Sequence, residues 1–128
     1  MVVMTTRLTH FAINTDDVDA TQAFYGSVFG WRFHDYGQSG FVQIMDPSGD
    51  GPMGAIQQRR DLVDDRPTVG FECTFGVDDV DAVRDRIVAA GGRILMDKST
   101  IPGVGHLLAF EDPGGNPALA MQYEASAA

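Results

Sequence analysis

The chain has 128 residues, 44% of them hydrophobic, which is enough for one domain with a buried core. Its formal net charge of −9 is opposite to the basic footprint that nucleic-acid phosphates require, so we expect no nucleic-acid partner. There is no apolar run of roughly 18 residues and no signal-peptide pattern at the start, so we expect no membrane partner. The single cysteine, Cys73, excludes an intrachain disulfide framework and favours the reducing cytoplasm.

One short run of residues occurs twice in the chain. Asp16–Ala20 and Asp78–Ala82 share the sequence DDVDA and lie almost half a chain apart. His10 and Glu72 precede the two copies by the same number of residues. Further along each half, the turn-forming runs DPSG and DPGG follow in the same order. Because internal repeats define architecture, we predict two copies of one structural module.

The first strand is predicted at residues 8–14, where residue types alternate with a period of two. Phe11 and Ile13 share one face of this strand, and we expect that face to meet a helix. His10 lies on the opposite face, beside small or polar residues. Small side chains on that face leave space for a cavity.

The first helix is predicted at residues 18–29. Asp16 or Asp17 would supply the N-cap oxygen, and Gly30 the left-handed C-cap. Further strands are predicted at 31–33, 41–45 and 53–59, with turns at 37–40 and 46–51. The first module is therefore βαβββ and spans residues 7–59.

A charged segment that contains Pro67, at residues 60–70, is predicted to connect the modules. The second module spans 71–123, with a first strand from Phe71 and a helix at 80–90. Its later strands are predicted at 93–96, 106–110 and 118–123, with a loop at 99–105. We expect the tail at 124–128 to fray. The fold class is thus α+β, with two βαβββ modules forming a half-barrel cavity.

The alternation places candidate site residues on the open faces of the modules. His10 and Glu72 project from equivalent first strands, and imidazole with carboxylate suits a divalent ion such as Zn, Fe, Mn or Ni. Phe41 and Gln43 alternate toward the same open face, and His106 opens a strand near the expected rim. We therefore predict that these five residues bind the ligand.

The chain resembles the vicinal oxygen chelate superfamily, which includes glyoxalase I, bleomycin-resistance proteins, extradiol dioxygenases and methylmalonyl-CoA epimerase. The motifs that carry the resemblance cover nearly the whole chain: HFAI at 10–13, FY at 24–25, VFGW at 28–31, VDDVDA at 77–82, AGG at 90–92, IPGVG at 101–105 and DPGGN at 112–116. They are specific for the fold and much less specific for the reaction. Among its members, the chain is most similar to small bacterial glyoxalase-like proteins.

The resemblance implies metal ligands on the first and last strands of each module. His10 and Glu72 match the first-strand positions. The last-strand position that normally carries glutamate is Leu119 here, and residues 53–56 offer no ligand. Gln57 and Gln122 lie nearby but by alternation are expected to face the other way. A divalent metal cofactor is thus implied with an incomplete ligand set.

Two functional classes remain open. One is a protein that binds or sequesters a small ligand, for which the acidic chain favours a cationic compound. The other is a metal-dependent lyase, isomerase or dioxygenase of the glyoxalase I type that uses His10 and Glu72. In either class Glu72 has three candidate roles: a partner of His10, a ligand for a positive group, or a catalytic base. We also expect a homodimer, because a half-barrel leaves strand edges that need cover.

Other residues have simpler structural explanations. Cys73 lies on the helix-facing side and is predicted to be a core thiol. His34 is expected at the surface. The twin acidic runs lack the calcium-loop pattern and are better explained as helix caps.

Overall fold

The computed structural model describes residues 6–37, 39–45, 49, 51–63 and 65–128. Its contacts divide the chain into two units. Unit 1 comprises Met1–Leu8 with Cys73–Ala128, and unit 2 comprises Thr9–Glu72. The predicted turn at 46–51 falls largely outside the described residues.

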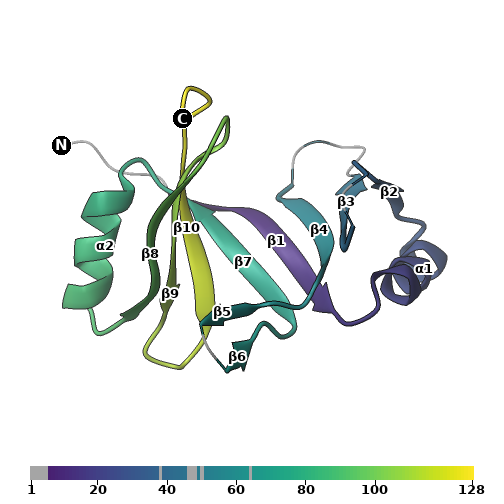
Figure 1. Cartoon of the computed structure of the whole chain (residues 1–128), viewed down its shortest axis with the longest axis horizontal. Helices are drawn as coiled ribbons and strands as arrows, with labels where there is room; N and C mark the ends of the chain where they lie inside the picture. The colour runs from purple at the N-terminus through teal and green to yellow at the C-terminus, as the bar shows by residue number, and fades with distance from the viewer. Residues whose placement is uncertain (1–5, 38, 46–48, 50, 64) are drawn as a thin grey trace. The chain divides into compact units, whose positions relative to one another are not determined.

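Unit 2 contains the first helix and a four-stranded arrangement in the order β2-β3-β4-β1 (Figure 1). Its elements are β1 (Arg7–Thr15), α1 (Val18–Phe29), β2 (Arg32–His34), β3 (Phe41–Met45) and β4 (Met53–Gln58). β1 runs parallel to β4, whereas β3 is antiparallel to both β4 and β2. This is the predicted βαβββ order.

The core of unit 2 lies on one face of these strands. Its buried residues are Ile13, Val42, Ile44 and Ile56, and partly buried aromatic residues pack around them. Phe11 packs against this cluster. The prediction that Phe11 and Ile13 share the apolar face is therefore confirmed, and His10 is left on the other face by the alternation of the strand.

The termini of α1 are fixed by local chemistry. Asp17 is the N-cap, and its Oδ1 accepts a hydrogen bond from the Ala20 amide at 3.0 Å. Gly30 takes the left-handed conformation with φ of 70°, and its amide donates to the carbonyl of Gly26 at 3.0 Å. Both ends satisfy backbone groups that a helix leaves unpaired.

Between the modules the chain forms a short hairpin of β5 (Asp61–Val63) and β6 (Arg66–Pro67). Thr68 anchors its base. The Thr68 amide donates to the Arg60 carbonyl at 2.7 Å, and the Arg60 amide donates to Thr68 Oγ1 at 3.1 Å. Thr68 is buried, so this pair of hydrogen bonds is protected from water.

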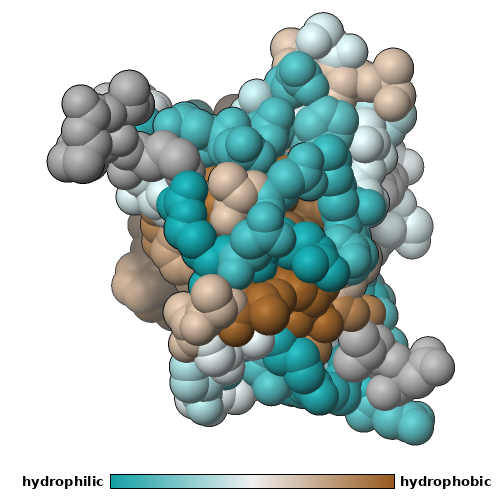
Figure 2. All heavy atoms as spheres, turned by 90° about the vertical axis from the view of Figure 1, so that its left-hand side faces the viewer, coloured by the Kyte–Doolittle hydropathy of each residue, from teal (hydrophilic) through white to brown (hydrophobic). Residues whose placement is uncertain are grey.

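Unit 1 repeats the same pattern in the order β7-β10-β9-β8. Its elements are β7 (Phe71–Gly76), α2 (Val80–Ala89), β8 (Arg93–Ile101), β9 (Gly105–Glu111) and β10 (Pro117–Tyr123). β10 is parallel to β7 and antiparallel to β9, and α2 packs on β8, β9 and β10 (Figure 1). Figure 2 shows that the surface on the α2 side is mainly hydrophilic, with an apolar patch below the centre of the view.

α2 begins as α1 does. Asp79 is the N-cap, and its Oδ1 accepts from the amides of Asp81 and Ala82. Asp17 and Asp79 hold the same place in the two DDVDA runs, so the repeated run begins equivalent helices. The α+β class with two βαβββ modules is confirmed.

Unit 1 has an apolar cluster on each face of its strands. The cluster beneath α2 consists of Val77, Val80, Leu108 and Ala120. The cluster on the opposite face consists of Leu107, Ala109, Leu119 and Met121, with Leu95 and Met96 packed against it. This opposite face of unit 1 is the counterpart of the strand face that carries His10 in unit 2, and along β9 and β10 it is apolar.

Two local predictions are wrong. β8 continues to Ile101, through the first three residues of the predicted 99–105 loop, because bulges between Ile94 and Ser99 restore its pairing with β9. The tail is not frayed: the Gly103 amide donates to the Ala127 carbonyl at 2.9 Å, and Ala127 is 9% exposed. The turn after β8 thus binds the tail backbone.

Candidate functional site

Glu72 is the most unusual polar residue in unit 2. It is 6% exposed, on a strand where burial of a charge is costly unless the charge is paired. Its Oε2 accepts a hydrogen bond from Arg60 Nη2 at 2.8 Å. Its Oε1 is buried and has no hydrogen-bond partner among the described residues. One carboxylate oxygen is therefore satisfied, and the other is a buried acceptor without a partner among the described residues.

Arg60 was not a predicted site residue. It lies in the connector, held by the two Thr68 hydrogen bonds and by the neighbouring Arg59 amide, which donates to the Thr15 carbonyl at 3.0 Å. Its side chain is 42% exposed. Neither hydrophobic periodicity nor a motif marks Arg60 in the sequence, because its role depends on where the connector folds back.

His10 lies on β1, and unit 2 brings β1 beside the start of β7. The rings of Phe11 and Phe71 stack with centroids 6.1 Å apart, and the Asn14 amide donates to the Gly70 carbonyl at 2.9 Å. Burial lowers the pKa of His10 below its ordinary value, and the negative charge of Glu72 partly offsets this effect. The imidazole is therefore neutral at pH 7 and senses the Glu72 charge.

The pairing of β4 with β1 shows which way Gln57 points. Met53 pairs in register with His10, so Ala55 and Gln57 share the His10 face. Gln57 Nε2 donates to Asn14 Oδ1 at 3.0 Å. The prediction that Gln57 faces away is wrong, because parallel partners in register point to the same side of a sheet.

Gln122 does face the helix in unit 1. Its Oε1 accepts a hydrogen bond from the Val80 amide at 3.0 Å, which completes the N-terminus of α2. The two glutamines at corresponding strand ends therefore have different roles.

Phe41 and Gln43 lie on β3 and are partly buried, whereas Val42 between them is in the core. Gln43 Oε1 accepts a hydrogen bond from the Tyr36 hydroxyl. Phe41 lines a hollow of about 400 Å³ at the N-terminus of α1. Carboxylates exposed to solvent dominate this hollow, and its lining includes neither His10 nor Glu72.

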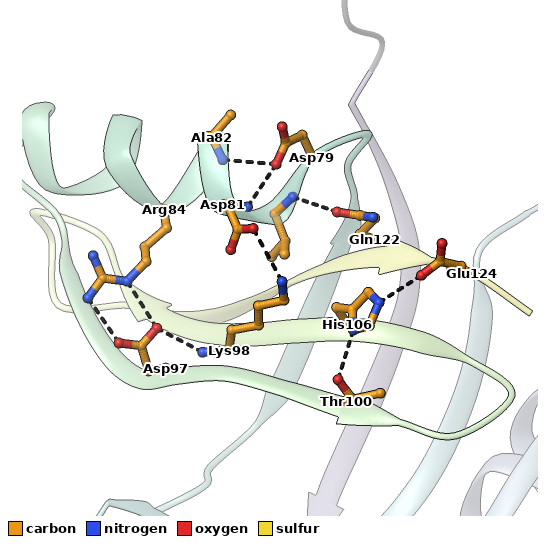
Figure 3. A network of polar contacts seen from close by, with 11 residues as sticks. Asp79, Asp81, Ala82, Arg84, Asp97, Lys98, Thr100, His106, Gln122 and Glu124 are labelled. Carbon is orange, nitrogen blue, oxygen red and sulfur yellow. Dashed lines mark hydrogen bonds and ion pairs between the residues drawn. The ribbon is translucent and has the colours of Figure 1, made fainter. Parts of the chain in front are cut away.

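His106 belongs to a polar network of unit 1 (Figure 3). Its Nδ1 lies 2.8 Å from Thr100 Oγ1, and its Nε2 lies 2.7 Å from Glu124 Oε2. Both ring nitrogens are thus engaged by residues of the β8–β9 hairpin and the tail. These contacts explain His106 without a ligand.

The structure also shows the surroundings of His34, Cys73 and Leu119. His34 is exposed, with its ring edge-on to Tyr36 at a centroid distance of 4.2 Å. Cys73 is a free, half-buried thiol. Leu119, at the position where the resemblance implies glutamate, is 8% exposed within an apolar cluster.

A catalytic metal site needs three or more ligands. Among the described residues, no group of three or more His, Cys, Asp or Glu side chains could hold a metal ion. Glu72 Oε2 already binds a guanidinium, which has no capacity to ligate a metal. The donor set that the described residues supply therefore does not fit a divalent metal cofactor.

The sequence and fold place the chain in a known family. The family model described as Glyoxalase/Bleomycin resistance protein/Dioxygenase superfamily matches residues 7–118. The chain belongs to this superfamily. Among the described residues, no helix is long and apolar enough to cross a membrane.

The chain is about 30% identical to individual relatives. The chain is 30% identical over 120 residues to the anthracycline biosynthesis protein DnrV of Streptomyces peucetius, covering 82% of this chain and 42% of DnrV. It is 29% identical over 106 residues to CFP32 of Mycobacterium bovis, provisionally described as a glyoxylase, covering 80% of this chain and 40% of CFP32. The chain thus spans less than half the length of these relatives.

A solved structure supports the fold alone. The superfamily member from Vibrio splendidus 12B01 aligns with a TM-score of 0.64 at 16% identity, covering 92% of this chain and 99% of that chain.

Proposed function

We propose that this chain is a small-molecule-binding protein whose ligand donates a hydrogen bond to Glu72. The observation that carries the proposal is the buried Oε1 of Glu72, which has no partner among the described residues. A buried acceptor left unsatisfied costs roughly 1–3 kcal/mol. A bound donor, whether an ammonium or a neutral N–H or O–H group, would remove this cost.

His10 offers a second polar group for a small ligand. Burial lowers the pKa of His10, so at pH 7 its neutral ring can donate one hydrogen bond and accept another, and the Glu72 charge acts on it. The family description names bleomycin resistance, and a relative is named for anthracycline biosynthesis. Compounds of these two classes are therefore suitable first probes.

The experiment measures binding of bleomycin and of an anthracycline by calorimetry. We expect Glu72→Gln to weaken binding of whichever probe binds by about 10- to 100-fold, the range for losing one hydrogen bond to a charged group. Glu111→Gln is the matched control, because it makes the same change at a partly buried carboxylate of unit 1 that pairs with Arg93. Equal affinity of wild type and Glu72→Gln would refute the proposal.

The chain is also proposed to form a homodimer. On α1, Phe24, Val28 and Phe29 are 57%, 54% and 61% exposed, which is a large apolar surface for one helix. In the part of the chain that the structure describes, β2 and β8 each pair with another strand on one side only. Sedimentation at micromolar concentration should give the mass of two chains, and a monomer mass would contradict the proposal. The location that we propose for the protein is the cytoplasm, because a chain with a single cysteine suits a reducing compartment.

A further inference from the structure

We infer that Arg60 is the resident cation of the Glu72 site and keeps divalent metal ions out of it. The inference rests on the same carboxylate as the proposed function. It concerns a different property, however, namely which cation that carboxylate accepts. The Arg60 Nη2 atom lies 2.8 Å from Glu72 Oε2, in the range of a charge-assisted hydrogen bond.

The geometry leaves a metal little room. An ion bound to Oε2 would lie about 2.0–2.2 Å from that oxygen, and hence no more than about 5 Å from the guanidinium. Two like charges at that separation repel, and the repulsion is strong where water is scarce. Glu72 is 6% exposed, so screening by solvent is weak on the carboxylate side.

The remaining donors would not offset this repulsion. With Arg60 in place, the candidate donors are Glu72 Oε1 and His10, whose pKa responds to the Glu72 charge, and no group of three or more His, Cys, Asp or Glu side chains among the described residues could hold an ion. Leu119, at the position where the resemblance implies a further carboxylate, lies in an apolar cluster. Two protein ligands are fewer than structural or catalytic zinc sites use.

Arg60 is held in position before any ligand arrives. Its backbone is fixed on one side by the two Thr68 hydrogen bonds and on the other by the hydrogen bond from Arg59 to Thr15. The carboxylate of the pair is also buried, since Glu72 is only 6% exposed. The pair is therefore a built feature of unit 2 and differs from a surface contact between two mobile chains.

The experiment titrates the protein with Zn²⁺ alone, by calorimetry and by NMR of the His10 ring. The variants are wild type, Arg60→Gln, Glu72→Gln and the double variant Arg60→Gln/Glu72→Gln. Arg59→Gln is the matched control, because it removes the same charge one residue away, where the guanidinium pairs with the exposed Asp16 at 3.5 Å.

Wild type, Glu72→Gln and Arg59→Gln should show no saturable Zn²⁺ site that shifts the His10 resonances. Arg60→Gln should bind Zn²⁺ at least tenfold more tightly than wild type, with His10 shifts, and the double variant should lose this gain. If Arg60→Gln unfolds without metal, recovery of its fold by Zn²⁺ is the same result.

Two outcomes overturn the inference. One is a wild-type Zn²⁺ site that shifts His10 and disappears in Glu72→Gln, a test that does not depend on the Arg60 variant folding. The other is an Arg60→Gln variant with no gain in affinity or fold from Zn²⁺. Because the probe is the metal alone, either result leaves the binding of organic ligands to be judged separately.

Discussion

Replacing Arg60 by glutamine should destabilise the protein much more than replacing its partner Glu72. Arg60→Gln leaves a carboxylate that is 6% exposed without its only described partner. Breaking a buried pair in this way costs about 3–5 kcal/mol. Because the Arg60 side chain is 42% exposed, water can reach the vacated oxygen, and we expect a loss near the lower end, about 3 kcal/mol.

Glu72→Gln should have a much smaller effect on stability. The guanidinium that it leaves behind can turn to solvent, and the buried negative charge is removed. We expect the free energy of unfolding to stay within about 1 kcal/mol of wild type. In the double variant most of the Arg60→Gln loss should be recovered, since neither charge remains. The coupling between the two positions should then be about 2–3 kcal/mol.

Urea denaturation at pH 7 measures these differences. The single tryptophan, Trp31, packs against the core of unit 2 and reports its unfolding by fluorescence. Arg59→Gln serves as control and should change stability by less than about 0.5 kcal/mol, because its partner Asp16 is 80% exposed. Equal losses in the two single variants, or an additive loss in the double variant, would show that Glu72 does not depend on Arg60.

Four further predictions concern the backbone, the histidine and the helix cap. Gly105→Ala should cost about 2–4 kcal/mol in urea unfolding, because φ is 154° and a Cβ would lie 2.1 Å from a backbone oxygen of β10. Gly103→Ala, with φ of 77° and open space, should cost only about 1 kcal/mol, and equal costs would refute the clash. Glu72→Gln should lower the pKa of His10 further, because the charge that raises it is gone; an NMR titration showing no change would contradict this. Since the folded-state pKa of His10 is depressed, stability should fall as the pH drops through about 6.5, and the slope should be smaller in His10→Gln. Asp79→Ala should cost about 1 kcal/mol through loss of the α2 cap, and an unchanged urea midpoint would contradict this.

Local features of the fold could be predicted from the sequence. The bounds of α1, its Gly30 cap and the equivalent start of α2 depend on side chains within a few residues of the backbone that they satisfy. The choice between Asp16 and Asp17 as N-cap could not be made, since both carry the same oxygen. The structure selects Asp17.

The site was only partly predictable for the same physical reason. Alternation along one strand places His10 opposite the core, and the repeat makes Glu72 its counterpart. The partner of Glu72 is a different matter: Arg60 reaches it through the fold of the connector, over a separation that no periodic pattern encodes. Gln57 was misassigned because its direction depends on register with β1.

The boundaries between the two contact units fall inside strands and not in the connector. The chain passes from one unit to the other between Leu8 and Thr9, inside β1, and between Glu72 and Cys73, inside β7. A fragment cut at the connector and ending at Gly70 would therefore lack Glu72, the residue that Arg60 pairs with in unit 2. The segment that repeats in the sequence and the segment that holds together by contacts are different pieces of chain. An attempt to express one half alone should follow the contacts.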